Sequence, residues 1–363
     1  MFYHLLFPLN EQIGFMRLFG YITFRSAYGA ITALLICFLL GSWLIRQLAR
    51  WQLREHIRPD GPTTHLTKTG TPTMGGLLIV AAVAIPTLLW QRLDTSYTWI
   101  ILLCTVWMGT VGFIDDYLKT VKRYPRGLVV RYKLFGQITL GLVVGLIMVF
   151  WPPGPPEHAT ATMIPFVKDK MLSFGPLYIP VVILVITATS NSVNLTDGLD
   201  GLAIGLVGIA GLAFVVMAYL SGRVDTAEYL NIVYLPDSGE LTIFALSLVG
   251  ACLGFLWFNA HPAQVFMGDT GSMALGGALA GMALLLKKEF LLIIVGGVFV
   301  IEAASVLIQV ASYRWRDRKR VFKMAPLHHH FELLGWAESK VVIRFWILGI
   351  MLALISMSTF KIR

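Results

Sequence analysis

The amino-acid sequence predicts an all-α integral membrane protein with about ten transmembrane helices. Of its 363 residues, 56% are hydrophobic and 13% are charged, whereas a soluble domain usually carries about 25% charged residues. The mean hydropathy is +0.73, and one spanning helix needs roughly 20 apolar residues. This composition excludes a disordered chain, a fibrous repeat and an ordinary soluble domain. We expect a single membrane-embedded domain over residues 1–363.

Apolar stretches between charged residues give the positions of the helices. Residues 1–20 precede the first stretch and are expected to form an interfacial N-terminal segment or to lack order. The ten expected spans are 26–45, 73–91, 95–114, 134–151, 175–193, 201–220, 241–258, 270–286, 290–311 and 341–360. The ninth span contains Glu302, and the tenth has Arg344 near its start.

The basic residues are divided unequally between the two sides of the predicted bundle. In a ten-helix chain the connections after helices 1, 3, 5, 7 and 9 share one face, and they hold 18 of the 29 Lys and Arg residues. The positive-inside rule places this face in the cytoplasm, so both termini are expected on the periplasmic side. The net charge of +9 is thereby explained without a nucleic-acid partner.

The unusual polar residues gather on the same face, which predicts one site in a cleft that opens to the cytoplasm. Asp115 and Asp116 end a long uncharged stretch. Neighbouring residues of a helix point about 100° apart, so the two carboxylates cannot be equivalent ligands. One of them is expected to face the cavity, and the other a metal or a lysine such as Lys119. The alternative is that the pair only marks the boundary between membrane and water.

A second polar group follows the fifth span, where Asn191, Asn194, Asp197 and Asp200 recur every three residues. This spacing keeps side chains on neighbouring parts of one helical face, until Gly198 permits a break. Polar side chains at the end of an apolar helix are unfavourable unless they bind something. A capped helix end with a solvated turn is the alternative.

A third group is the segment Phe266-Met-Gly-Asp-Thr-Gly-Ser272, which places Asp269 between two glycines directly before an apolar stretch. Glycines allow close backbone approach, and the free N–H groups of the next helix attract an anion. A carboxylate beside a phosphate is a natural Mg²⁺ ligand. Asp269 is therefore the main candidate for a metal ligand, with Asp115 or Asp116 as a second one. A tight loop without a ligand is the alternative.

Three successive histidines, His328, His329 and His330, form a fourth group. Adjacent residues point in different directions and no cysteine is near, which argues against a zinc site. With Lys323 just before them, contact with a phosphate or proton handling fits better, and a solvated loop is the alternative. Glu302 is a functional candidate because it is an intramembrane acid, or else it is a protonated packing residue.

These groups together indicate a protein that handles phosphates at a membrane. Carboxylates suited to Mg²⁺, glycine-rich loops and many basic residues predict sugar-phosphate or phosphoryl transfer from a soluble nucleotide to a lipid acceptor. A transporter or flippase is the alternative class. Transporters place their acids near the midplane and often consist of two related halves, and the sequence has neither feature.

The same residues resemble a known set of motifs. They are Thr71-Pro-Thr-Met-Gly-Gly76, Gly112-Phe-Ile-Asp-Asp116, Asn191-Ser-Val-Asn-Leu-Thr-Asp-Gly-Leu-Asp-Gly-Leu-Ala203, Trp257-Phe-Asn259, Phe266-Met-Gly-Asp269 and Ala325-Pro-Leu-His-His-His330. In this order they are similar to those of the polyprenyl-phosphate N-acetylhexosamine-1-phosphate transferases. The resemblance extends from about Tyr21 to the end of the chain, and the loop from Ala325 to Trp336 resembles the branch that acts on N-acetylmuramoyl-pentapeptide.

The resemblance implies a Mg²⁺-dependent enzyme of the bacterial inner membrane that forms a homodimer. UDP-N-acetylmuramoyl-pentapeptide would react with undecaprenyl phosphate to give lipid I and UMP. We expect the lipid phosphate to attack directly, without an aspartyl-phosphate, because it is already ionised near neutral pH. A sister enzyme that uses UDP-N-acetylglucosamine is the nearest alternative.

The resemblance also implies roles for individual residues. Asp269 would hold Mg²⁺ at the pyrophosphate, and Asp115 would activate the lipid phosphate, with Asp116 in support; which of the last two is the base stays open. His328, as a catalytic residue, and His329 would contact the donor pyrophosphate. The substrate pocket would otherwise be formed by Lys68, Thr73, Lys119, Lys133, Asn191, Asn194, Asp197, Gly198, Leu199, Asp200, Asn259, Phe266 stacked on uracil, Gln309 and His330.

Overall fold

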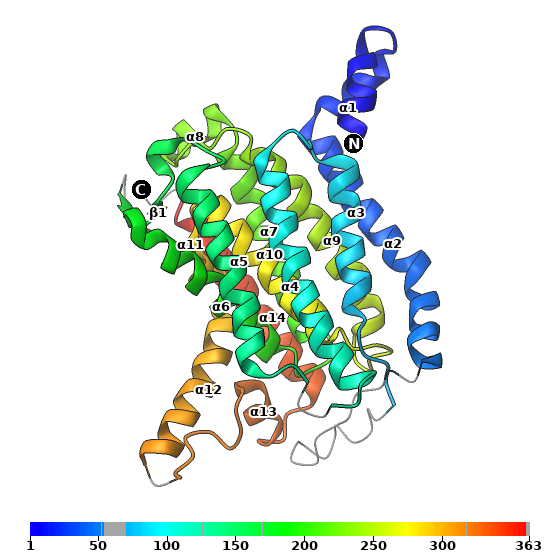
Figure 1. Cartoon of the computed structure of the whole chain (residues 1–363), viewed down its shortest axis with the longest axis vertical. Coiled ribbons are helices and arrows are strands. Elements are labelled where there is room, and N and C mark those ends of the chain that lie inside the picture. Colours follow the sequence, from blue (N-terminus) through cyan, green and yellow to red (C-terminus); the bar gives the residue numbers. More distant parts are fainter. Residues whose placement is uncertain (52, 54–69, 125–126, 168–169, 317, 361–363) are drawn as a thin grey trace.

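The computed structural model describes residues 1–51, 53, 70–124, 127–167, 170–316 and 318–360, and these fold into a bundle of helices (Figure 1). Among the residues described, eight helices are long and apolar enough to cross a membrane. They are α2 (Ile22–Arg50), α4 (Ser96–Thr120), α5 (Val130–Phe150), α6 (Tyr178–Thr196), α7 (Leu202–Ser221), α9 (Leu241–Asn259), α12 (Gly297–Trp315) and α14 (Glu338–Ser358). The chain is therefore a multi-pass membrane protein, as its composition predicts.

Two further helices lie in predicted spans but are shorter or less apolar. α3 (Gly76–Trp90) has 15 residues. α10 (Gly268–Leu285) has 18 residues, and all but its first two are buried. α10 packs against α4 and α6 in the centre of the bundle (Figure 1). A Cβ atom on Gly112 of α4 would lie only 2.1 Å from the backbone oxygen of Asp269, so α4 and α10 are in backbone contact at this point.

The ninth predicted span is divided in the structure. α11 (Glu289–Val295) ends before Gly296, and α12 begins directly after it. Glycine pairs are common sites of a sharp kink, because neither residue has a side chain to pack on the preceding turn. The expectation of one continuous helix over 290–311 was therefore wrong. Beyond the break, α12 leaves the bundle at its lower left (Figure 1).

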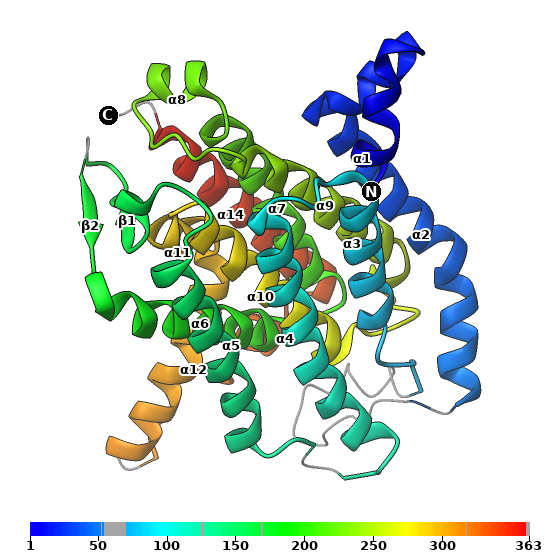
Figure 2. The same cartoon turned by 45° about the horizontal axis from the view of Figure 1, so that its top comes forward.

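Residues 1–20 form three short helical segments at one end of the bundle (Figure 2). They are α1 (Phe2–Leu6) and the 3₁₀ helices η1 (Phe7–Glu11) and η2 (Gly14–Gly20). Phe2 and Phe19 pack on Trp90 at the end of α3, with ring centroids 4.9 and 6.0 Å away. The segment is thus ordered, while its expected place at the membrane interface stays a prediction.

A buried ion pair lies below this segment. Both terminal nitrogens of Arg25 in α2 donate to the carboxylate of Glu240, each at 2.7 Å. The side chains are only 1% and 3% exposed. Arg25 also donates to the backbone oxygen of Trp90 at 3.1 Å, so one side chain joins α2, the end of α3 and the start of α9.

The two ends of the bundle carry different structures. The end with the N-terminal segment also carries an antiparallel pair of strands, β1 (Ala161–Met163) and β2 (Met171–Ser173), and the short helix α8 (Val224–Leu230) (Figure 2). Further 3₁₀ turns are η4 (Pro156–His158), η5 (Gly175–Leu177) and η6 (Ser238–Glu240). The opposite end carries α13 (Leu327–Glu332) and the connection from α4 to α5 (Figure 1). The polar groups singled out in the sequence lie toward this second end.

Candidate active site

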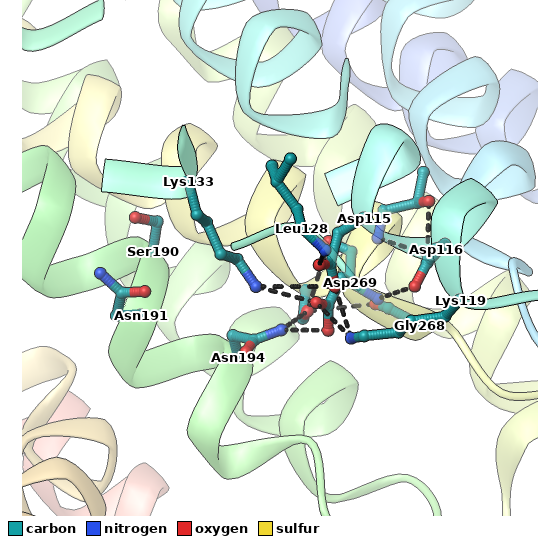
Figure 3. A network of polar contacts seen from close by, with 12 residues as sticks. Asp115, Asp116, Lys119, Leu128, Lys133, Ser190, Asn191, Asn194, Gly268 and Asp269 are labelled. Carbon is teal, nitrogen blue, oxygen red and sulfur yellow. Dashed lines mark hydrogen bonds and ion pairs between the residues drawn. The ribbon is translucent and has the colours of Figure 1, made fainter. Parts of the chain in front are cut away.

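Four helix ends meet at the centre of the polar region (Figure 3). α4 contributes Asp115, Asp116 and Lys119 near its C-terminus, α5 contributes Lys133 from its first turns, α6 contributes Asn194, and α10 contributes Asp269 from its N-terminus. Residues from three of the predicted polar groups are therefore brought together with Lys133, as the sequence predicts.

Asp269 lies at the middle of this cluster. Its Oδ2 atom accepts hydrogen bonds from the ammonium groups of Lys133 at 2.8 Å and Lys119 at 2.9 Å. Its Oδ1 atom accepts one from Nδ2 of Asn194 at 2.8 Å, and the same amide donates to Ser272 Oγ at 2.8 Å. Two cations thus converge on one carboxylate at the first turn of a buried helix.

Asp115 faces the same two lysines. Its Oδ1 atom accepts the backbone N–H of Leu128 at 2.6 Å. Its Oδ2 atom forms an ion pair with Lys119 and lies 3.9 Å from Nζ of Lys133. The residue is only 2% exposed, so the connection between α4 and α5 fixes this carboxylate beside Asp269.

Asp116 points elsewhere and holds the N-terminus of α10. Its Oδ1 atom accepts the backbone N–H of Asp269 at 3.0 Å. Its Oδ2 atom accepts the N–H of Thr270 at 2.8 Å and the hydroxyl of Thr270 at 2.6 Å. The free N–H groups of a helix start need such acceptors. Asp116 therefore positions Asp269 through the backbone, while Asp115 faces the cations.

Glycine is required where Asp116 meets α10. Gly268 has a φ of +70°, which L side chains rarely adopt. A Cβ atom there would lie 2.6 Å from Oδ2 of Asp116 and 3.1 Å from Oγ1 of Thr73. Of the two glycines near Asp269, Gly268 is therefore required by the backbone conformation of the turn.

Thr73 belongs to a segment that pairs with the residues before α10. Phe266 donates its N–H to the oxygen of Pro72 at 2.8 Å and accepts the N–H of Gly75 at 2.9 Å. Gly76 then donates to the oxygen of Met267 at 2.8 Å. This pairing places Thr73, which is 4% exposed, next to Gly268. Lys68, the other candidate of this region, lies outside the described residues.

Asn191 lies one turn before Asn194 and makes different contacts. Its amide forms a two-way pair with Gln137 of α5, with both bonds at 3.1 Å. It also donates to the backbone oxygen of Thr187 at 2.8 Å. Asn191 thus joins α5 to α6, whereas Asn194 reaches Asp269. Gln137, which is fully buried, was not among the predicted residues, although it lies four positions after Lys133 on the same helix.

The loop after α6 forms a second polar cluster. Asp200 accepts the N–H of Ala263 at 3.1 Å, and its carboxylate lies 3.2 Å from Nδ1 of His261. Its own N–H donates to Glu338 at the start of α14 at 2.8 Å. Glu338 also lies 3.4 Å from His261. His261 and Glu338 were missed in the sequence, and Glu338 carries no motif that could have revealed it.

The other residues of this loop are packed between neighbouring segments. Asn259 accepts the N–H of Gly201 at 3.1 Å and donates to the oxygen of Val265 at 2.9 Å. Leu199 is buried, and Asp197 terminates α6. A Cβ atom on Gly198 would lie 2.2 Å from Nε2 of His328, so the histidine segment packs directly against this loop.

The three histidines have separate environments. His328 is fully buried, with Nδ1 3.2 Å from the carboxylate of Glu302, which also accepts its backbone N–H at 3.2 Å. His329 lies 2.8 Å from Glu332. His330 accepts the N–H of Lys323 at 3.1 Å. Glu302 thus fixes the first histidine from α12.

Gln309 supports the same segment from α12. Its Oε1 atom accepts the N–H groups of Val321 and Phe322, each at 3.0 Å. Its Nε2 atom donates to the oxygen of Phe322 at 3.0 Å. These bonds hold the connection between α12 and the histidines, and the expected contact of Gln309 with a substrate stays a prediction.

The three aspartates are chemically suited to a divalent cation. Asp115, Asp116 and Asp269 each offer a carboxylate oxygen, and these atoms lie within 4.8 Å of one another. Carboxylate oxygens are the ligands that Mg²⁺ prefers, together with phosphate oxygens and water. Both oxygens of Asp116 accept groups of α10, whereas Asp269 and Asp115 each have an oxygen paired with lysine, so these two carboxylates fit this part best.

Comparison with known proteins gives consistent matches. The model of glycosyl transferase family 4 matches residues 98–287, which include both aspartate motifs. A phospho-N-acetylmuramoyl-pentapeptide-transferase of Desulforapulum autotrophicum is 53% identical over 363 residues, with all of both chains covered. Proteins of the same name from Citrifermentans bemidjiense and Thermodesulfovibrio yellowstonii are 52% and 48% identical, again over the full length of both chains.

Proposed function

Because the chain belongs to the phospho-N-acetylmuramoyl-pentapeptide transferases of glycosyl transferase family 4, we propose that its site performs their reaction. Phospho-N-acetylmuramoyl-pentapeptide passes from UDP-N-acetylmuramoyl-pentapeptide to undecaprenyl phosphate. An oxygen of the lipid phosphate forms a bond to the sugar-bound phosphorus, and the bond from that phosphorus to UMP breaks. UMP leaves with the electron pair, and the lipid product is lipid I.

The convergence of Lys119 and Lys133 on Asp269 carries this proposal. The reaction brings two anionic phosphates together, and phosphoryl transfer depends mainly on alignment and on neutralising charge. Two ammonium groups held at fixed positions by Asp115 and Asp269 meet this need. When a phosphate binds, the ammonium group of each lysine can turn toward it while the lysine stays next to the carboxylates.

Asp115 is the residue that we assign to the lipid phosphate. Its carboxylate is held by the N–H of Leu128 and faces Lys119, so it can accept a proton from a monoprotonated phosphate. The carboxylate of Asp116 accepts its hydrogen bonds from the first residues of α10 and serves to position Asp269. The two neighbouring aspartates then have separate roles, and the direct route needs no covalent aspartyl-phosphate.

Mg²⁺ fits the same place. Asp269, with Asp115 as the second carboxylate, would hold the ion, and its charge would stabilise the pyrophosphate of the donor as the bond to UMP breaks. Lys119 and Lys133 pair with Asp269 in the structure, so their ammonium groups would leave this carboxylate to the ion and turn to the phosphates. The chain's own part is to hold the three aspartates close together.

We assign the donor to the neighbouring loop and histidine segment. Asp197, Gly198, Leu199, Asp200 and Asn259 would form the nucleotide side, with Phe266 against the base. His328 would contact the donor pyrophosphate, and Lys68, Thr73, Asn191, Gln309, His329 and His330 would complete the pocket. Support comes from the packing of His328 on Gly198, which joins two of these motifs.

We place the site on the cytoplasmic face of a bacterial inner membrane. The connections on the site's side carry most of the basic residues in a ten-span arrangement, which agrees with the positive-inside rule. Both termini would then be periplasmic. A homodimer is part of the same proposal, and the mass of the purified protein in detergent tests it.

The first experiment uses purified full-length protein with undecaprenyl phosphate, UDP-N-acetylmuramoyl-pentapeptide and Mg²⁺. Release of UMP and formation of the lipid-linked product are measured, with EDTA and Asp269→Ala as controls. We expect product that disappears in both controls. Product with UDP-N-acetylglucosamine but not with UDP-N-acetylmuramoyl-pentapeptide would assign the chain to the sister branch. No product with either donor would favour a transporter.

A further inference from the structure

Three polar side chains bind one another deeper in the bundle than the cluster around Asp269. Gln137 of α5 is fully buried. Its Nε2 atom donates to Oδ1 of Asn191 at 3.1 Å and to Oγ of Ser190 at 3.2 Å, and its Oε1 atom accepts from Nδ2 of Asn191 at 3.1 Å. These bonds use both hydrogens and the oxygen of the Gln137 amide, so its orientation is fixed. Gln137, Ser190 and Asn191 together form the Gln137 layer.

This layer lies about one helical turn from two side chains that contact Asp269. On α5, Gln137 follows Lys133 by four residues, so both side chains are on one face of the helix. On α6, Asn191 precedes Asn194 by three residues, which also keeps these two on neighbouring parts of one face. Lys133 and Asn194 both donate to the Asp269 carboxylate. The Gln137 layer therefore joins α5 to α6 directly behind these donors.

α10 touches the same layer. A Cβ atom on Gly276 would lie only 2.5 Å from Cα of Ser190, so α10 and α6 are in backbone contact at this level. Gly276 follows Asp269 by seven residues, which is about two helical turns. The Gln137 layer therefore connects α5, α6 and α10 a short distance behind the site.

The start of α5 depends on contacts of this kind. Val130, Tyr132 and Phe135 in its first turns are exposed, so their side chains do not fix the helix against the bundle. Lys133 extends from this segment on a flexible four-carbon stem. The position of its ammonium group therefore depends on how the next turn of α5 is held.

Other contacts of α5 do not set its rotation against α6. Gly141 packs on α6, where a Cβ atom would lie 2.6 Å from Cα of Ile183, but apolar contact is not directional. Nε1 of Trp107 donates to the oxygen of Gly136 at 2.9 Å, and this bond ties α5 to α4. Hydrogen bonds have preferred angles, and among the described residues the Gln137 layer supplies those between side chains of α5 and α6.

We propose that Gln137 is a positioning residue for the transfer reaction. Through Ser190 and Asn191 it sets the rotation of α5 that brings the ammonium group of Lys133 to Asp269. The inference rests on the proposed function, in which Lys133 neutralises the phosphates. Gln137 acts through Lys133 and not by touching the substrates. An amide is needed at position 137, because neither an acid nor a hydrocarbon offers two donors and an acceptor.

Gln137→Met tests this role, because it keeps the unbranched shape of the side chain and removes all three hydrogen bonds. Gln91→Met is the matched control, since Gln91 is equally buried and directly follows α3 at the opposite end of the bundle. We expect kcat to fall about tenfold or more in Gln137→Met, because small displacements of a site residue reduce the rate steeply. Gln91→Met should keep the normal kcat, and a normal kcat in Gln137→Met would overturn the proposal.

A double-mutant cycle with Lys133→Ala separates positioning from a general loss of stability. Single-turnover measurements with enzyme in excess keep the slow rates accessible. If Gln137 acts through Lys133, adding Gln137→Met to Lys133→Ala should lower the rate by less than about twofold. The melting temperature should still fall as much as in Gln137→Met alone. An equal loss of rate in both backgrounds would show that the amide acts independently of the lysine, and it would overturn the proposal.

An exchange of the two amides keeps the test valid if Gln137→Met does not fold. Gln137→Asn combined with Asn191→Gln leaves the summed length of the two side chains unchanged, and each amide can still donate to the other and accept from it. We expect the double variant to recover much of the rate lost in Gln137→Asn alone. A rate no higher than that of Gln137→Asn would count against the proposal.

A distance measurement makes the test independent of turnover. Val130→Cys in α5 and Leu195→Cys in α6 place spin labels at two exposed positions, and the three native cysteines are buried. We expect Gln137→Met to shift or broaden the distance distribution between the labels, and Gln91→Met to leave it unchanged. A distribution that does not respond to Gln137→Met would refute the positioning role.

The two proposals therefore fail separately. If the unmodified protein forms lipid I and Gln137→Met does so at the same rate, the reaction holds and the positioning role is wrong. If the unmodified protein forms no lipid I while the label distance responds to Gln137→Met, the proposed reaction is wrong and Gln137 still positions the start of α5.

Discussion

Asp115 and Asp116 differ by one position and by their whole environment. Asp115 faces two lysines and a loop N–H, whereas Asp116 accepts three hydrogen bonds from the first residues of α10. Helical geometry predicts that such neighbours diverge, but it does not say which one turns to the cavity. Which aspartate faces the cavity depends on the tertiary contact between α4 and the first residues of α10.

Asp116→Asn should lower both stability and activity. An amide replaces one acceptor oxygen with a donor, so at least one N–H or hydroxyl of α10 loses its partner. Loss of a cap of this kind costs about 0.5–2 kcal/mol. Asp115→Asn should lose activity with a smaller change in melting temperature. Thermal unfolding and initial rates of both variants check this, and an Asp116→Asn protein with unchanged stability and rate would contradict the assigned role.

Glu302 offers a second test at the scale of one residue. Its carboxylate accepts the backbone N–H of His328 and lies beside the buried ring. Glu302→Gln keeps an acceptor oxygen and should retain most of the activity, whereas Glu302→Ala leaves that N–H unpaired in a buried place and should lose much more. Measuring kcat and KM for the donor separates the two, and equal activity of both variants would show that the contact is not needed.

The site residues could be predicted from the sequence where their side chains are charged or polar at the end of an apolar stretch. The aspartates, Lys119, Lys133 and Asn194 meet as expected, because acids and lysines at helix ends carry their own signal. Asn191 fits the same three-residue spacing but pairs with Gln137, and no local pattern distinguishes the two asparagines. His261 and Glu338 were not predicted, because their partner, Asp200, lies far away in the sequence.

Contact between α4 and α10 is the element-scale feature on which the cluster depends. Gly112 lies against the backbone of Asp269, so the helix carrying the acids and lysine meets the helix carrying Asp269 without side chains between them. All residues of α10 after the second are buried, which explains why this helix is rich in Gly and Ala and less apolar than an ordinary span.

Gly112→Ala should therefore separate the two helices and reduce activity by about a hundredfold or more, the loss typical of misplaced catalytic groups. Gly208→Ala in α7 is the matched control, since a Cβ atom there would meet Cys252 at 3.5 Å, an ordinary contact distance. Initial rates and melting temperatures of both variants test this. Wild-type activity in Gly112→Ala would mean that the backbone contact is not required.

Helix boundaries were predictable to the extent that charge marks them. The expected spans all contain helix, because the absence of charged residues over about 20 positions leaves few other structures in a membrane. The break at Gly296 was not predicted, since a glycine pair in an apolar stretch can pack in a straight helix or end one. Only the packing of α11 and α12 on different neighbours decides between the two.

At the scale of the whole molecule, the candidate active site and the buried Arg25–Glu240 ion pair lie toward opposite ends of the bundle. Arg25 and Glu240 join α2, α3 and α9 beneath the N-terminal segment, far along the bundle from Asp269. An arrangement of this kind allows stability and activity to be changed separately.

Glu240→Ala should test that separation. Removing one partner of a buried pair leaves the other charge unpaired and costs about 3–5 kcal/mol, so the melting temperature in detergent should fall strongly. Asp94→Ala breaks an exposed pair with Arg92 and should cost no more than about 1 kcal/mol. Below its melting temperature, Glu240→Ala should turn over substrate at the normal rate, and an equal loss of stability in both variants would be the contrary result.

The glycine break before α12 has a consequence for the length of the chain around it. α12 starts its helical turns at Gly297, and Glu302 reaches His328 only because it stands five residues further on. Adding or removing one residue within α11 would leave the five residues from Gly297 to Glu302 unchanged, but it would turn the end of α11 by about 100° and so change the direction in which α12 continues. The length of α11, seven residues, therefore helps to set the direction in which α12 presents Glu302. The identity of these residues is not the only thing that matters.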